Sequence, residues 1–244
     1  MRRIFLTLLV LLAGAATASA QTPDFLFGQP RGSLGLRGSW LFASEGSDLF
    51  DFVRKELTVD RGAFNAPAIA ADLAFVVTPR VDAVFGVEFS QASIRSEYRN
   101  FVDNNRLAIE QDTRLRQTNL TGSVRVALTP RGVGISRFAW IPRTVTPYVG
   151  GGGGFLRYEF KQTGDFVDAL DPRLAVFSDT IASKGWTPSA HAFGGVDLKV
   201  HRLMFLTLEG RYVWAAATLQ ERFENFDPID LAGFRLAAGL NVLF

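Results

Sequence analysis

The C-terminal stretch GFRLAAGLNVLF, residues 233–244, decides the fold because two kinds of side chain alternate along it. Every second position is apolar: Phe234, Leu236, Ala238, Leu240, Val242 and Phe244. The positions between them include Arg235, Gly239 and Asn241. Successive side chains of a β-strand point to opposite faces, so a period of two predicts a strand with one wholly apolar face.

The same alternation recurs in seven segments upstream. They cover residues 33–42, 68–77, 83–91, 119–128, 147–160, 189–200 and 205–214. About nine to eleven residues suffice for a tilted strand to cross a membrane, and bacterial barrels contain an even number of strands. The sequence therefore predicts an all-β fold, a transmembrane antiparallel up-and-down β-barrel of eight strands.

The connections between these segments alternate in length, as they do in membrane barrels. Short turns at 78–82 and 200–204 contrast with long polar connections at about 44–66, 95–117, 161–187 and 216–231. We expect the long connections outside the cell and both termini on the periplasmic side of the outer membrane. A count of ten strands stays open if residues 174–177 pair within the third long connection.

The face opposite the apolar one mixes small residues with isolated charges of both signs. These predicted luminal charges are Arg37, Asp72, Glu88, Arg125, Arg157, Glu159, Asp197, Lys199, Glu209, Arg211 and Arg235. The near-balance of sign suits mutual pairing, because an unpaired buried charge is costly. Eight strands enclose a space that side chains can fill. We therefore predict a filled polar lumen, with an ion pathway along these charges as the alternative.

The N-terminus and the composition restrict the compartment and the partners. The basic start, the apolar stretch 4–13 and the small residues 18–20 predict a cleaved secretory signal peptide over 1–20, leaving 21–244 as one barrel domain. The chain has 26 basic and 24 acidic residues, and removal of Arg2 and Arg3 balances them, which argues against nucleic acid as a partner. Without cysteine, thiolate chemistry and Cys-ligated metals are excluded. We expect no cofactor and no metal.

Five consecutive glycines interrupt the fifth predicted strand: Gly150, Gly151, Gly152, Gly153 and Gly154. No Lys-Ser or Lys-Thr follows them, so a phosphate-binding loop is not indicated. The apolar residues that we expect this strand to turn toward lipid are Tyr148, Leu156, Tyr158 and Phe160. Their parity predicts that Gly151 and Gly153 face the lumen, where they leave room for a long side chain from across the barrel.

Residues 130–145 form a connection of intermediate length that carries arginines and aromatic residues without an acid. The residues concerned are Arg131, Arg137, Phe138, Trp140 and Arg143. We hypothesise an interfacial periplasmic segment, with the aromatic residues at the membrane surface and the arginines on phospholipid phosphates. An ordinary solvated turn is the alternative.

The predicted signal peptide, the eight amphipathic segments and the terminal Phe244 together resemble the small outer-membrane β-barrel proteins of Gram-negative bacteria, with the OmpA/OmpX-like architecture. The resemblance implies insertion by the barrel-assembly machinery, for which Leu240, Val242 and Phe244 form the recognition signal. It also implies contact with the lipopolysaccharide and phospholipid of the outer membrane. It identifies no substrate and no extracellular ligand, because fold does not imply function.

The remaining candidate chemistry is Ser189 and His191, which share one face of a predicted strand. Some small outer-membrane barrels are lipid A-modifying enzymes that use a serine and a histidine. Here no Asp or Glu lies at a readable spacing, so a hydrogen-bonded interior histidine is the preferred interpretation. We predict no catalytic residue and a structural or surface-interaction role. The alternatives are a narrow porin-like channel for ions or small solutes and, third, a lipid A-modifying enzyme.

Overall fold

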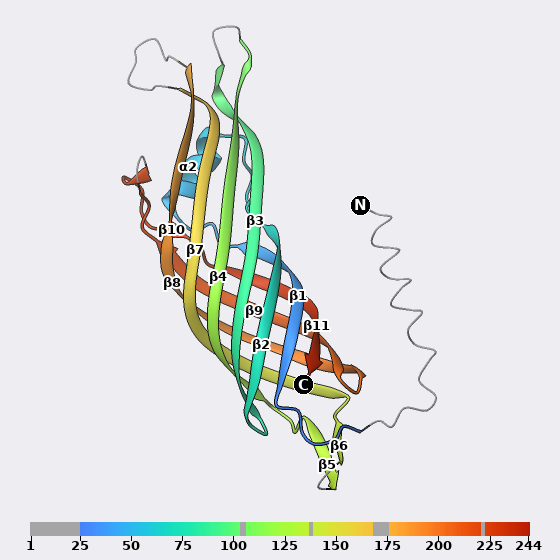
Figure 1. Ribbon diagram of the computed structural model, residues 1–244. Coiled ribbons are helices and arrows are strands. Elements are labelled where there is room, and N and C mark those ends of the chain that lie inside the picture. The colour runs from blue at the N-terminus through green and yellow to red at the C-terminus, as the bar shows by residue number, and fades with distance from the viewer. Residues whose placement is uncertain (1–24, 103–105, 137–138, 168–175, 221–222) are drawn as a thin grey trace, which may run out of the picture.

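The computed structural model describes residues 25–102, 106–136, 139–167, 176–220 and 223–244. Eight long strands pair antiparallel into a closed ring (Figure 1). They are β1 (Gly32–Ala43), β2 (Ala66–Thr78), β3 (Val81–Val102), β4 (Ala108–Ala127), β7 (Val145–Val167), β8 (Val176–His201), β9 (Met204–Ala217) and β11 (Gly233–Leu243). The ring closes where β11 pairs with β1, from Ser33↔Leu243 to Ala43↔Gly233. The predicted eight-stranded antiparallel barrel is confirmed.

Two predictions fall wholly or partly on residues that the structure does not describe. The signal peptide over 1–20 lies outside the described residues. Of the segment 174–177, Val176 and Phe177 begin β8 and pair with Val167 and Phe166 of β7. These two residues therefore extend an existing strand pair and add no ninth or tenth strand.

Seven of the eight strands turn the face that the alternation predicts toward the outside. The exposed fractions of Leu36, Ile69 and Phe85, for example, are 65%, 68% and 57%. The alternate positions, such as Ser33 and Ser90, are buried in the interior. The barrel thus presents an apolar surface outward, and ring closure satisfies the backbone hydrogen bonds of every strand within it, as a lipid environment requires.

Strand β7 has the opposite orientation to the one predicted. Tyr148, Leu156, Tyr158 and Phe160 are buried in the interior, while Val149 and Phe155 on the other face are 45% and 61% exposed. The register of β7 with both neighbours is unbroken. The glycines therefore exchange faces as well: Gly150, Gly152 and Gly154 are luminal, and Gly151 and Gly153 point outward. The prediction failed because both faces of this strand are apolar, one meeting lipid and the other the interior described below.

The strands are unequal in length and build a wall on one side of the ring. β3, β4, β7 and β8 contain 22, 20, 23 and 26 residues, whereas β1, β2, β9 and β11 contain 12, 13, 14 and 11. The four long strands, here the tall wall, rise beyond the others (Figure 1). We name this the tall end, and the opposite end, where β1 begins and β11 stops, the terminal end. Much of the sequence 95–117 and 161–187, which we predicted as connections, is therefore strand. These extensions resemble connections in sequence because their solvated faces are polar.

An apolar plug fills the tall end of the interior. Helix α2 (Asp48–Glu56) lies against the inner side of the tall wall (Figure 1). Its acidic first turn and basic last turn suit the helix dipole. The plug comprises Leu49, Phe50, Val53, Leu57, Val59, Phe64, Leu219, Phe223, Ile229 and Leu231. It packs on Leu156, Tyr158 and Phe160 of β7, with the rings of Phe160 and Phe223 5.4 Å apart. The interior is filled, as predicted, but its tall end is apolar.

A short hairpin lies beneath the terminal end (Figure 1). It consists of β5 (Gly132–Ser136) and β6 (Ala139–Pro142). The amide of Leu26 donates to the carbonyl of Trp140 at 2.7 Å, and the amide of Trp140 donates to the carbonyl of Leu26 at 3.0 Å. At the tall end, β10 (Ile229–Asp230) pairs with the last residues of β9. Over the part of the chain that the structure describes, no helix is long and apolar enough to cross a membrane.

Candidate functional site

A charge network occupies the middle of the interior. The Nη2 of Arg37 lies 2.7 Å from Oδ2 of Asp72, and its Nη1 lies 2.8 Å from Oε1 of Glu209. Glu209 also pairs with Arg211 at 2.9 Å and accepts a hydrogen bond from the Tyr148 hydroxyl at 2.9 Å. Because little solvent reaches these groups, their attraction is weakly screened. The network ties strands β1, β2, β7 and β9 together across the lumen.

Arg235 of β11 forms the second part of this network. Its side chain is 2% exposed, and its Nε donates to Oε1 of Glu88 at 2.5 Å. Its Nη2 donates to the Gln117 side-chain oxygen at 3.3 Å, and its Nη1 donates to the carbonyl of Gly233 at 3.3 Å. All three nitrogens of the guanidinium are therefore satisfied inside the barrel, which a buried charge requires.

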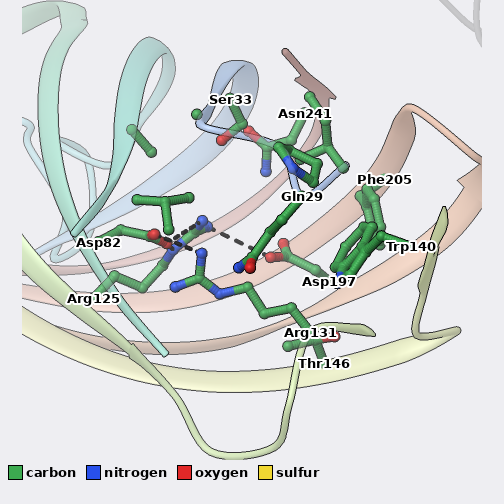
Figure 2. Close-up of a pocket in the computed structure, with 15 residues that line it drawn as sticks. Gln29, Ser33, Asp82, Arg125, Arg131, Trp140, Thr146, Asp197, Phe205 and Asn241 are labelled. Carbon is green, nitrogen blue, oxygen red and sulfur yellow. Dashed lines mark hydrogen bonds and ion pairs between the residues drawn. The ribbon is translucent and has the colours of Figure 1, made fainter. Parts of the chain in front are cut away.

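A second cluster of charges closes the terminal end (Figure 2). Asp82, whose side chain is 1% exposed, lies 2.8 Å from Nη2 of Arg125 and 2.6 Å from Nη1 of Arg131. Arg125 also reaches Asp197 at 3.5 Å. These side chains, together with Trp140 from the hairpin, line a cavity of about 50 Å³. The charges in it are balanced, and the space suits a few water molecules.

Most of the predicted luminal charges are found in the interior. Arg37, Asp72, Glu88, Arg125, Asp197, Glu209, Arg211 and Arg235 take part in the contacts above. Lys199 lies on the same face of β8 as Asp197. Arg157 and Glu159 are the errors: both lie on the outward face of β7, because the orientation of that strand was reversed. The interior positions of Asp82, Arg131 and Tyr148 were not predicted. Asp82 was assigned to the turn 78–82, Arg131 to the interfacial segment and Tyr148 to the lipid-facing side of its strand.

His191 is an interior histidine held by a hydrogen bond, as predicted. Its Nε2 lies 2.7 Å from the Ser123 hydroxyl, and the side chain is buried. Ser189 does not contact it; the hydroxyl of Ser189 donates to the side-chain oxygen of Asn119 at 3.0 Å. The Phe193 ring stacks on the imidazole with 5.9 Å between ring centroids. The two residues considered for catalysis therefore serve separate polar contacts within the packed lumen.

The interfacial hypothesis for residues 130–145 is wrong for two of its residues. Arg131 turns into the barrel to bind Asp82, and Trp140 lines the cavity beside it (Figure 2). The buried carboxylate of Asp82 explains this, since an uncompensated charge there would be costly. Arg143 is exposed. Arg137 and Phe138 lie outside the described residues.

The ion pair between Arg131 and Asp82 is expected to hold the β5–β6 hairpin against the terminal end of the barrel. Replacing Arg131 by glutamine should loosen the hairpin at the terminal end, because it removes the ion pair between this arginine and Asp82. We expect Trp140, which lines the cavity, to become at least about twofold more accessible to acrylamide quenching. Arg143→Gln, at an exposed position of the same segment, is the matched control. Equal quenching in both variants would show that the ion pair does not hold the hairpin.

Among the described residues, no group of three or more histidine and acidic side chains is placed to hold a metal ion.

No family model matches the sequence, and no curated protein matches it. Similar solved structures include Neisserial surface protein A, at 14% identity and a TM-score of 0.47, over 87% of this chain and 97% of that one. OprG from Pseudomonas aeruginosa matches at 10% identity and a TM-score of 0.42, over 90% and 99%. Ail, the attachment invasion locus protein of Yersinia pestis, matches at 10% identity and 0.41, over 88% and 100%.

The fold assignment rests on the strand pairing of this chain. Its closed ring of eight strands, with an apolar outer surface and a filled interior, defines a small membrane β-barrel. This is the architecture that the resemblance implied. The candidate site that the fold creates is the pair of luminal charge clusters below the apolar plug.

Proposed function

We propose that the protein is an outer-membrane barrel with a structural and surface-interaction role, neither catalytic nor conducting. The observation that carries the proposal is the apolar plug. Leu49 and Phe50 of α2 and Ile229 are at most 1% exposed between the plug and the tall wall, so apolar side chains fill that end of the interior. Below the plug, the paired charges take up the space that ions would need, and an eight-stranded barrel offers little more.

The same proposal places the tall end outside the cell and both termini in the periplasm. Outer-membrane barrels have short periplasmic turns and long extracellular extensions. Here the turns β2–β3 and β8–β9 at the terminal end are short, while the tall wall rises at the other end. The tall wall is then the part of the molecule available to extracellular partners. Recognition of Leu240, Val242 and Phe244 by the assembly machinery remains a prediction.

Conductance in a planar bilayer tests the closed interior. We expect no steady ionic current from the refolded wild-type protein, because plug and charge network together leave no continuous aqueous path. A steady, ion-selective current altered by Arg125→Gln, but not by the outward-facing Arg157→Gln, would contradict the proposal and favour the narrow channel.

The mass of lipid A, measured before and after expression of the protein, tests the absence of catalysis. We expect this mass to be unchanged, and a change would favour the lipid A-modifying enzyme.

A further inference from the structure

The register of the tall wall sorts its outward side chains into rows that change character with distance from the membrane. The last apolar row contains Val87, Leu120, Phe155 and Pro188. The next row contains Phe89, Thr118, Arg157 and Trp186, followed by Gln91, Arg116, Glu159 and Lys184, and then by Ser93, Arg114, Lys161 and Ala182. We name the five cations of these rows, Arg114, Arg116, Arg157, Lys161 and Lys184, the basic band.

The basic band is largely unneutralised. Its one carboxylate, Glu159, lies 3.5 Å from Arg116, and the two side chains are 37% and 41% exposed, so this contact is weak. Within the described part of the chain, the other four cations form no ion pair with any carboxylate. An exposed surplus of positive charge next to an apolar surface is the electrostatic arrangement that attracts anionic groups at a membrane surface.

Aromatic rings fix the position of the band relative to the membrane. The guanidinium of Arg157 lies 5.9 Å from the Trp186 ring centroid, and that of Arg116 lies 6.0 Å from the Phe89 ring centroid. Trp186 is 55% exposed beside the last apolar row. Tryptophan is enriched at the boundary between lipid tails and headgroups, and cation–π contact holds each guanidinium at that level. The band therefore lies at headgroup height.

The charge changes sign farther out along the same strands. The following positions carry Asp112, Glu97, Glu110 and Asp165, with Arg95 as the one cation among them. Arg95 pairs with Glu110. An anion is thus attracted to the rows beside the membrane and disfavoured at the two acidic rows beyond them. This restricts an anionic ligand to the membrane surface.

We propose that the basic band binds the phosphate groups of a lipid A-type glycolipid in the outer leaflet, whose acyl chains lie on the row of Val87, Leu120 and Phe155. Two phosphates on one sugar backbone suit several cations spread over three strands, and Arg and Lys both bind phosphate well. The proposal rests on the proposed function for the placement of the tall end outside the cell. It identifies one class of partner for the tall wall.

Titration with purified lipid A tests the proposal directly. The protein, refolded in maltoside micelles, is titrated with diphosphoryl lipid A while tryptophan fluorescence is recorded. The test variant carries Arg114→Gln, Lys161→Gln and Lys184→Gln, which removes three unpaired cations and leaves the stacked Arg157 in place. We expect its affinity to fall roughly 10- to 100-fold, since each basic residue at a membrane surface contributes appreciably. Dephosphorylated lipid A should bind both proteins weakly and equally.

A matched variant carries Arg31→Gln, Arg80→Gln and Arg143→Gln, three exposed cations at the terminal end. It loses the same charge and should keep the wild-type affinity. An equal loss in both triple variants, or equal binding of dephosphorylated lipid A, would overturn the proposal. Binding of inorganic pyrophosphate as tight as that of lipid A would assign the band to a free anion and overturn it too.

The outcome is distinguishable from a failure of the proposed function. Micelle titration depends neither on conductance nor on orientation, so a conducting barrel would leave this result readable. Conversely, cleavage of an epitope tag at the tall end by protease added to intact cells reports the orientation alone. A tall end that is protected in intact cells would overturn the placement in the outer leaflet even if lipid A bound to the purified protein.

Discussion

Replacement of Gly152 by alanine is expected to prevent the barrel from folding, or to lower its free energy of unfolding by about 3 kcal/mol or more. A Cβ at this position would collide with the carbonyl oxygen of Gly122 and lie 2.7 Å from the Cα of Ser123. Both are backbone atoms of β4, so no change of rotamer can relieve the clash. The heat-dependent gel shift of unboiled protein measures the folded fraction, and urea titration measures the stability of what folds.

Gly153→Ala is the matched control, one residue away in the same strand. Its Cβ would have only the carbonyl oxygen of Ser189 nearby, at 3.3 Å, and would otherwise point outward. We expect a change within about 1 kcal/mol, because a single alanine at an outward strand position costs little. If both variants folded equally well, the luminal orientation of Gly152 and the close approach of β7 to β4 would both be contradicted.

Replacement of Arg235 by methionine should lower the free energy of unfolding by about 3–5 kcal/mol. The change leaves Glu88 without its cation, in a barrel interior where the side chain of Glu88 is 15% exposed. The side-chain oxygen of Gln117 also loses its donor. The urea midpoint of the refolded barrel, recorded by the same gel shift, gives the loss.

Combining Arg235→Met with Glu88→Gln separates the missing contact from the stranded charge. The double variant should recover much of the lost stability, since removing both charges of a buried pair is far less costly than removing one. A double variant as unstable as Arg235→Met alone would show that packing of the arginine side chain, rather than its charge, stabilises the interior.

The sequence predicts a strand's orientation where its two faces meet different surroundings. In β11, Leu236 and Leu240 meet lipid while Arg235 meets paired charges, and the alternation is unambiguous. In β7, Phe155 meets lipid while Leu156 meets the apolar plug, so hydrophobicity cannot distinguish the faces. The plug itself was missed, although Leu49, Phe50 and Val53 have helical spacing after Ser47, a residue suited to a helix N-cap.

The candidate site was predictable in composition and less so in pairing. The alternation alone placed Arg37, Asp72 and Glu209 inside the barrel. When the apolar face of a barrel strand points outward, the opposite face, with its charges, must point into the lumen. Which cation meets which acid depends on the relative shift of strands around the ring, and a sequence does not show that shift. For the same reason the contact between Asp82, near the start of β3, and Arg131, in the connection after β4, could not be foreseen.

The seam between β1 and β11 has a consequence for the order of folding. All the other pairs of long strands join strands that follow one another in the chain. The pair β1–β11 instead joins Ser33 to Leu243, near the two ends of the barrel sequence. Contacts between distant residues carry the largest loop-closure entropy, so the seam is expected to close last. The ion pairs of Arg37 with Glu209 and of Arg235 with Glu88 each join strands on opposite sides of this seam. Interactions absent from a transition state slow unfolding rather than hasten folding, so these luminal ion pairs should govern how long the barrel stays closed.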